Sequence, residues 1–202
     1  MITGPKYKIA RRLGAPIFEK TQTQKYALHL ERKGKKRGFT KPKSEYGIQL
    51  NEKQKARFTY GLTERQFSNY VKEALSKKHG NAAQTIYEFL ERRLDNVVYR
   101  LGLASTRLGA RQMVSHGHIS VNGKRVNVPS SRVSFGNKIE ITLRSQNKPI
   151  FENLDEKIKN VTVPSWISFD SVKKVAEIQG MPVMSKMDNM FDLNAVVEFY
   201  SR

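Results

Sequence analysis

The sequence contains no cysteine among its 202 residues. Disulfide scaffolds, zinc sites with cysteine ligands, iron–sulfur clusters and thiol chemistry are therefore excluded. No apolar run approaches the ~20 residues that are needed to span a bilayer, so we expect no transmembrane helix. The basic residues at 1–12 are not followed by an apolar segment, and we therefore expect no secretory signal.

Acidic residues are scarce compared with basic ones. Against 37 Lys and Arg there are 18 Asp and Glu, which gives a formal net charge of +19 and a pI near 10.2. Residues 1–80 carry 20 basic and 6 acidic side chains, residues 81–148 carry 11 and 4, and residues 149–202 carry 6 and 8. Such an excess is typical of proteins that bind nucleic acid. We expect the first two segments to meet the polyanion and the last to serve as core or as a protein contact.

Glycine and proline interrupt residues 1–45 at seven positions, and five of the six residues from 32 to 37 are basic. We therefore expect no regular structure in this segment of the isolated chain. A charge run of this kind is either a solvated tail or a segment that folds on RNA. We favour RNA, because like charges at this density need a counter-charge before they become ordered.

Two amphipathic patterns predict helices in the middle of the chain. Residues 63–66 form a capping box, in which Thr63 caps the helix and Gln66 reaches back to it. The following residues form an apolar face at helical spacing, and the opposite face carries Arg65, Asn69 and Lys72. A second apolar stripe predicts one helix over residues 86–101.

Apolar spacing changes from helical to alternating after Gly117. A short helix begins at Ser105 or Thr106 and ends at Gly117. Asn122-Gly123 favours a tight hairpin turn between two alternating strands. We predict further strands over residues 133–135, 139–143, 161–163 and 167–169, and further helices over residues 171–179 and 193–200.

Basic and amide side chains crowd the short helix and the hairpin turn. They are Arg107, Arg111, Gln112, His116, His118, Asn122, Lys124 and Arg125. If the apolar faces of the helices and the hairpin pack together, these polar groups lie on one exposed side. Such an edge suits the phosphates and 2′-hydroxyls of folded RNA, which is recognised by shape and by unpaired nucleotides. The sequence shows no long recognition helix for a DNA major groove.

Three segments of this region resemble the small RNA-binding fold called the S-four domain. They read RLDNVVYRLG at 93–102, ARQMVSHGHI at 110–119 and VNGKRV at 121–126. Further segments extend the resemblance to both ends of the chain, at residues 4–6, 11–14, 45–50, 52–55, 60–67 and 197–202. Taken in this order, the segments are similar to the bacterial-type small-subunit ribosomal protein S-four family. Some members carry a cysteine cluster for zinc, and because this chain lacks it we expect no metal.

The resemblance implies an α+β fold in three parts. Residues 1–45 would be a basic N-terminal extension, and residues 46–90 a helical domain that is completed by residues 186–202. Residues 91–185 would be the inserted S-four RNA-binding domain, with short helices packed on a small, mainly antiparallel sheet.

The resemblance also implies a function that needs neither catalysis nor a cofactor. Members of the family are structural constituents of the small ribosomal subunit that bind the 5′ domain of its rRNA and nucleate assembly of the subunit body. They contact ribosomal proteins S-five and S-three, lie near the point where mRNA enters, and contribute to translational accuracy. The implied location is the bacterial cytoplasm, with a plastid stroma as the alternative, and no membrane is involved.

A set of rRNA contacts follows from the resemblance residue by residue. The set is Arg11, Arg12, Lys53, Lys55, Arg57, Arg65, Asn69, Lys72, Arg93, Arg107, Arg111, Gln112, Ser115, His116 and His118, completed by the turn residues Asn122, Lys124 and Arg125. The resemblance further places Lys41 and Lys43 beside the entering mRNA.

Some of these features have a second interpretation. His116 and His118 could suggest a metal pair, but without an acidic or cysteine partner we favour RNA contact or packing at the helix end. The aromatic residues before and within the capped helix could stack on bases. We expect Phe67 in the core, whereas for Tyr60 and Tyr70 core and stacking remain equally open.

Two other functions compete with a structural ribosomal role. One is an enzyme that borrows the S-four domain, such as a pseudouridine synthase or a tyrosyl-tRNA synthetase. The chain shows no phosphate-binding glycine loop or nucleophile elbow, and Glu91 and Asp95 lie on one helix without the signal of a pocket. The other is a polybasic protein of membrane surfaces, whose apolar helix faces would have to lie open.

Overall fold

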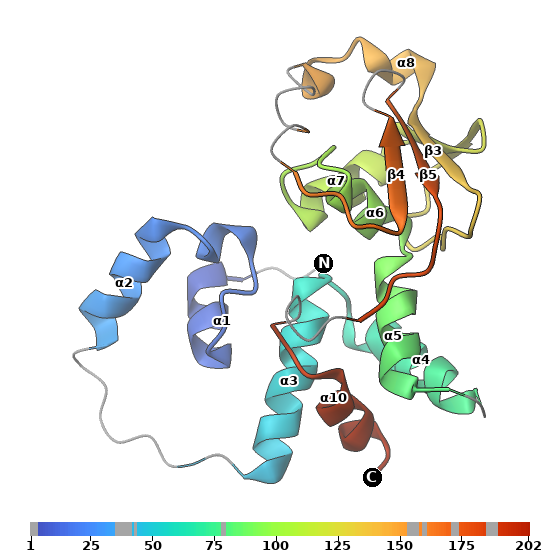
Figure 1. The fold of residues 1–202 in the computed structure, drawn as a ribbon. Coiled ribbons are helices and arrows are strands. Elements are labelled where there is room, and N and C mark those ends of the chain that lie inside the picture. Colours follow the sequence, from blue (N-terminus) through green and yellow to red (C-terminus); the bar gives the residue numbers. More distant parts are fainter. Residues whose placement is uncertain are drawn as a thin grey trace. The chain divides into compact units, whose positions relative to one another are not determined.

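The computed structural model describes residues 4–34, 42, 44–77, 80–152, 158, 161–170, 174–184 and 190–202. The chain forms two compact units, whose elements are labelled in Figure 1. The helical unit comprises residues within 1–86 and 184–202, and the sheet unit comprises residues within 87–183. The boundary between them falls within α5 (Ala82–Glu91).

The helical unit is built from short and medium helices. They are α1 (Lys6–Leu13), the 3₁₀ turn η1 (Glu19–Thr21), α2 (Gln24–Gly34), α3 (Glu45–Thr59), α4 (Glu64–Ser76) and α10 (Leu193–Tyr200). The terminal helix α10 packs against α3 and α4 (Figure 1). The C-terminal helix therefore packs against helices that lie more than 100 residues earlier in the sequence.

The expectation of no regular structure in residues 1–45 is wrong for α1 and α2. Pro5 and Gly14 bound α1 and do not interrupt it: Pro5 is its N-cap, and Gly14 is its C-cap with a φ of +73°. The helix buries its apolar side in a small cluster made of Ala10, Leu13, Ile17, Tyr26 and Phe58. Residues 35–37 of the basic run lie outside the described residues.

The capping box at the start of α4 is confirmed. The backbone N–H of Gln66 donates to Oγ1 of Thr63 at 3.3 Å, and the N–H of Thr63 donates to Oε1 of Gln66 at 3.4 Å. The helix buries Phe67, Tyr70 and Val71. The predicted helical period is therefore the observed one.

The sheet unit holds an antiparallel sheet whose order is β2-β1-β3-β5-β4 among the residues that the structure describes. Its strands are β1 (Ile119–Val121), β2 (Lys124–Val126), β3 (Lys138–Ile141), β4 (Ile167–Asp170) and β5 (Val175–Ile178). The short helices α6 (Leu94–Arg100) and α7 (Arg107–Ser115) lie on one face of the sheet (Figure 1). After β3 come α8 (Leu143–Gln146) and the 3₁₀ turn η2 (Pro149–Phe151). This is the mixed α+β architecture that the sequence predicts.

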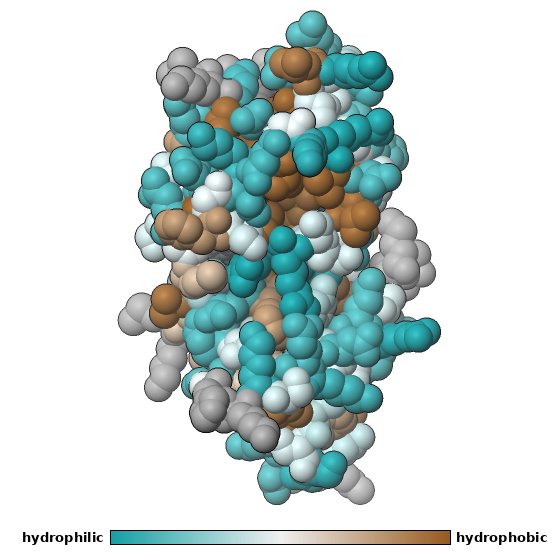
Figure 2. Space-filling model, turned by 90° about the vertical axis from the view of Figure 1, so that its right-hand side faces the viewer, coloured by the Kyte–Doolittle hydropathy of each residue, from teal (hydrophilic) through white to brown (hydrophobic). Residues whose placement is uncertain are grey.

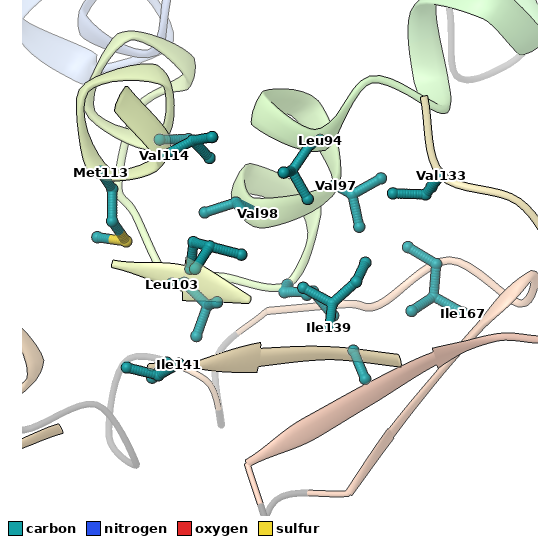
Figure 3. Packing of buried hydrophobic residues seen from close by; sticks show 14 of the residues in the cluster. Leu94, Val97, Val98, Leu103, Met113, Val114, Val133, Ile139, Ile141 and Ile167 are labelled. Atoms are coloured by element: carbon teal, nitrogen blue, oxygen red, sulfur yellow. The ribbon is translucent and has the colours of Figure 1, made fainter. Parts of the chain in front are cut away.

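One hydrophobic core joins the two helices to the sheet. Figure 3 shows side chains from α6 and α7 pointing toward side chains from the strands. Its members include Leu94, Val97, Val98, Leu103, Met113, Val114, Val133, Ile139, Ile141 and Ile167. Because alternate residues of β1 and β3 enter this core, the residues between them face the other side of the sheet.

The hairpin between β1 and β2 turns at Asn122 and Gly123, as predicted. Both residues have a positive φ, +51° and +75°, which a type I′ turn requires. Oδ1 of Asn122 accepts the backbone N–H of Lys138 at 2.8 Å. The turn residue therefore also fixes the hairpin to β3.

The prediction of one continuous helix over 86–101 is wrong. The chain turns out of the helix at Arg93, whose backbone is extended and forms an isolated bridge with Arg132. The N–H groups of Leu94 and Asp95 then donate to the carbonyls of Ser131 and Pro129 at 2.8 and 3.1 Å. The apolar stripe continues across the break, but α5 and α6 are separate helices.

Part of the prediction for the last quarter of the chain is also wrong. The helix expected over 171–179 is contradicted by β5, which covers 175–178 and pairs with both β3 and β4. Ala176 and Ile178 are buried and the residue between them is exposed, so the alternating period applies. The strands expected over 133–135 and 161–163 do not form, and Phe135 lies in a turn. The strand expected over 139–143 ends at Ile141, because Leu143 begins α8. The strand at 167–169 and the helix at 193–200 are confirmed.

Candidate nucleic-acid interface

A buried carboxylate at the start of α6 holds two arginines. Nε and Nη2 of Arg93 donate to Oδ1 and Oδ2 of Asp95 at 3.0 and 2.7 Å. Nε and Nη2 of Arg111, from α7, reach Oδ2 of the same carboxylate at 2.9 and 2.8 Å. The side chain of Arg93 is 2% exposed and that of Arg111 is 24% exposed. Asp95 therefore joins an internal arginine to a surface arginine.

Glu91 forms the second anchor of this kind. It is buried, and its carboxylate accepts Nε and Nη2 of Arg100 at 3.0 and 2.9 Å. Its backbone carbonyl and its Oε2 both accept Nδ2 of Asn96, at 3.1 and 3.0 Å. Because both contacts are acceptors, they turn Oδ1 of Asn96 outward, where it accepts Nε of Arg107 at 2.9 Å. The guanidinium of Arg107 also lies 4.3 Å from the ring centroid of Tyr99.

These contacts position three guanidinium groups at the surface of the sheet unit. We name Arg100, Arg107 and Arg111 the arginine cluster. Arg100 and Arg111 are partly exposed, at 29% and 24% of their side-chain surface. Planar guanidinium groups suit bidentate recognition of phosphate, and anchoring them in advance reduces the entropy that is lost on binding.

Sequence reasoning predicted Arg107 and Arg111 but missed what holds them. It assigned Glu91 and Asp95 no role, left out Asn96 and Arg100, and named Arg93 as a surface contact. The sequence signal for these anchors is the run of polar residues within an otherwise apolar helical pattern. Acidic and amide side chains are buried in such a pattern only when they are paired.

The remaining predicted residues of α7 and the hairpin are mostly exposed. Gln112, Ser115, His116, Asn122, Lys124 and Arg125 are exposed. Three of these are also bonded within the protein. Ser115 Oγ donates to the carbonyl of Arg111 at 2.9 Å, Nη2 of Arg125 donates to the carbonyl of His116 at 3.1 Å, and Asn122 accepts the N–H of Lys138 as described above. Figure 2 shows a face of the molecule on which hydrophilic side chains cover most of the surface.

His118 is buried, unlike its neighbour His116. Its Nδ1 lies 2.8 Å from Oγ of Ser145, which is also buried. Burial lowers the pKa of His118, and the positive charges of Lys148, His116 and Arg125 lower it further. The imidazole is therefore held in its neutral form and packs at the end of the helix.

The predicted rRNA contacts of the helical unit fall into two groups, those that are exposed or half-buried and those that are paired with glutamates. Arg65, Asn69 and Lys72 lie exposed on the polar face of α4, and Arg12 is exposed at the end of α1, where Arg11 is half-buried. On α3 the predicted cations are paired with glutamates: Nζ of Lys55 with Glu52 at 2.6 Å, and Arg57 with Glu64 at 3.3 Å. The polar face of α4 and Arg12 are thus the exposed members of the predicted set in this unit.

Lys53 of α3 lies inside the helical unit. It is 7% exposed, its Nζ donates to Oε1 of Glu64 at 2.6 Å, and its ammonium lies 4.5 Å from the ring centroid of Phe199. The hydroxyl of Tyr200 donates to the same Oε1 at 3.0 Å. Burial alone would raise the pKa of Glu64, but the hydrogen bond and charge of Lys53, with the help of Tyr200 and Arg57, lower it. Lys53 therefore fixes α10 to α3 and α4.

Burial decides whether the two tyrosines before and within α4 pack in the core or stack on bases. Tyr60 and Tyr70 are buried in the core together with Phe67, so the interpretation that these rings stack on bases is wrong.

Lys41 and Lys43 lie outside the described residues. In the part of the chain that the structure describes, no three His, Cys, Asp or Glu side chains gather as a metal site. No helix within those residues is both long and apolar enough to cross a membrane.

Comparison with known protein families agrees with this geometry. The S4 (S-four) domain model matches residues 92–139, and the model described as ribosomal protein S4/S9 N-terminal domain matches residues 1–91. The fold and the match to the S4 domain thus define an RNA-binding protein with an S4 domain.

Individual relatives resemble the chain over nearly its whole length. It is 44% identical over 203 residues to small ribosomal subunit protein uS4 of Ligilactobacillus salivarius (strain UCC118) and 43% identical over 206 residues to that of Limosilactobacillus reuteri subsp. reuteri, with 99% of this chain and 98% of each relative covered. The uS4 protein of Aquifex aeolicus is 41% identical over 206 residues, with 98% and 97% covered. The chain belongs to the uS4 family of ribosomal proteins. This family consists of structural proteins, which decides against an enzyme that borrows the S-four domain.

Proposed function

We propose that the protein is a structural constituent of the small ribosomal subunit, and that it binds the 5′ domain of the small-subunit rRNA and nucleates assembly of the subunit body. The observation that carries the proposal is the arginine cluster, in which buried Glu91, Asp95 and Asn96 hold surface guanidinium groups. A surface arranged in this way is suited to phosphates in a fixed geometry, and no catalytic step is needed.

The proposed contacts are the exposed and half-exposed members of the predicted set, with Arg100 added from the structure. Lys53, Arg93 and His118 act from inside the protein, where they position α10, Asp95 and the end of α7. The net charge of +19 supports a polyanionic partner. We further propose that residues 91–185 form the RNA-binding domain and that residues 46–90 and 186–202 form the helical domain.

Finer parts of the proposal rest on the family alone. They are contacts with ribosomal proteins S-five and S-three, a position of Lys41 and Lys43 beside the entering mRNA, and a contribution to translational accuracy. The proposed location is the bacterial cytoplasm, with a plastid stroma as the alternative, because the relatives compared above are bacterial.

The test is a filter-binding titration of the full chain against the 5′ domain of small-subunit rRNA. Total tRNA serves as the competitor, and the titration is repeated at two salt concentrations. We expect nanomolar binding that survives the competitor. Binding that disappears when tRNA is added would show attraction by charge alone and would overturn the proposal.

A further inference from the structure

A hollow of about 650 Å³ opens on the sheet unit next to α8. Ser120 of β1 contributes to it, together with its two cross-strand partners, Arg125 of β2 and Glu140 of β3. Directly opposite residues of an antiparallel pair lie on the same face. Because Ile119 and Ile139 enter the core under α6 and α7, the hollow lies on the opposite face of the sheet from these helices.

The lining of the hollow is predominantly positive. Arg125, Arg144, Lys148 and His116 line the hollow, and Glu140 is the one acidic residue among the lining residues. The lowered pKa of His118 reflects the same concentration of positive charge, since Lys148, His116 and Arg125 contribute to it after burial. An anionic group is therefore the favoured occupant.

The walls of the hollow are fixed by hydrogen bonds. Oγ of Ser145 joins Nδ1 of His118 at 2.8 Å and accepts the hydroxyl of Thr142 at 2.9 Å. The guanidinium of Arg125 lies directly against Gly117, so that a Cβ at this position would overlap it. The hydrogen bond from Arg125 to the carbonyl of His116 holds it there. The hollow is thus formed in advance of any ligand.

An apolar side chain at the same site narrows the choice of ligand. Leu143, the first residue of α8, lines the hollow and is 84% exposed. Cations beside an apolar surface suit a nucleotide, whose phosphate binds arginine and lysine and whose base packs on a flat or apolar surface. The volume lies within the range of about 300–1,000 Å³ that is usual for small-molecule sites.

We infer that this hollow binds an unpaired nucleotide of the rRNA, with Arg125, Arg144 and Lys148 on its phosphate and Leu143 against its base. The inference rests on the proposed function and deepens it, because it adds a second RNA contact on the opposite face of the sheet from α6 and α7. RNA is the favoured macromolecule, since bulged and looped nucleotides are the parts of folded RNA that proteins recognise individually.

The test compares two double variants of the full chain that remove the same kinds of side chain. Leu143→Ala with Lys148→Ala changes the hollow. Phe135→Ala with Lys138→Ala removes an exposed apolar residue and an exposed lysine of the sheet unit that do not line it. Both are titrated against the 5′ domain of the rRNA, and each complex is mapped by chemical probing at nucleotide resolution. Urea unfolding establishes that both variants are folded.

We expect the variant of the hollow to bind about tenfold more weakly, because it loses a phosphate contact and an apolar contact to the base. At least one unpaired nucleotide that the unaltered chain protects becomes reactive, while the control pair keeps both affinity and protections. Equal losses for the two variants, or weaker binding with all protections retained, would overturn the site and leave the proposed function standing. Failure of the unaltered chain to bind the rRNA would overturn both.

Discussion

Asp95 is the residue on which a buried and a partly exposed arginine converge, and its charge serves two purposes. It neutralises Arg93, which is 2% exposed, and it holds Arg111 at the surface. Two cations around one carboxylate leave a net positive charge close to the core. The carboxylate is therefore more important to the fold than either arginine alone.

Replacing Asp95 with Asn should lower the free energy of unfolding by about 3–5 kcal/mol, because it breaks a buried ion pair by removing the carboxylate that Arg93 contacts. Glu177→Gln on β5 is the matched control, since Glu177 is exposed, and it should change stability by less than about 0.5 kcal/mol. Urea unfolding followed by circular dichroism measures both. A loss below about 1 kcal/mol for D95N would mean that water or another acidic residue compensates Arg93.

His118 should make stability depend on pH. Burial lowers its pKa in the folded chain below the ordinary 6.5, so the unfolded chain takes up the proton more readily. Its contribution to stability is therefore complete above about pH 6.5 and is lost as the pH falls below that value. We expect the difference in unfolding free energy between the unaltered chain and His118→Asn to shrink from pH 7.5 to pH 5. A difference that stays constant over this range would contradict the neutral, buried imidazole.

At the scale of elements, local signals predicted local structure. The capping box of α4 and the Asn122-Gly123 turn are confirmed because the residues that decide them lie within a few positions of one another. The break between α5 and α6 was missed because Arg93 bridges to Arg132, 39 residues later. The strand β5 was missed because its partners β3 and β4 lie on other segments of the chain.

The same distinction applies to the candidate site. The helical period correctly predicted that Arg65, Asn69 and Lys72 are exposed on α4. It could not show that Lys53 and Arg93 are buried, since burial follows from tertiary packing and from pairing with carboxylates. The sequence thus shows which residues of a binding motif are positively charged, but their exposure depends on the fold.

The turn between α7 and β1 allows the placement of Arg125 to be tested separately from stability. Gly117 and Gly136 both have a positive φ, +70° and +77°, so an alanine at either should cost about 1–2 kcal/mol in backbone strain. Only at Gly117 would the new Cβ also meet a side chain, the guanidinium of Arg125, which can move aside. We expect equal loss of stability for Gly117→Ala and Gly136→Ala, but weaker rRNA binding for Gly117→Ala alone. Equal affinities would show that Arg125 does not contact RNA.

At the scale of the whole molecule, positive charge and fixed geometry make different contributions to binding. The net charge of +19 attracts any polyanion, and this attraction weakens as salt is added. In the proposed function, the arginine cluster adds positions that are set by Glu91, Asp95 and Asn96, and we expect these positions to distinguish one RNA structure from another. Salt dependence measures the contribution of net charge, and competition by tRNA measures the contribution of fixed geometry.

Removing two members of the arginine cluster should affect both the affinity for rRNA and its dependence on salt. Arg107→Ala with Arg111→Ala should cost about 2–4 kcal/mol of rRNA binding, at ~1–3 kcal/mol for each good contact. The slope of log K against log salt should become less steep by about 1.4–1.8, because each lost phosphate contact contributes about 0.7–0.9. Lys8→Ala with Lys25→Ala removes the same charge from α1 and α2, outside the predicted set, and should cost less than about 0.5 kcal/mol. Filter binding at several salt concentrations measures all three proteins. Equal losses for the two pairs would mean that total charge, and not the anchoring by Asp95 and Asn96, determines the affinity for rRNA.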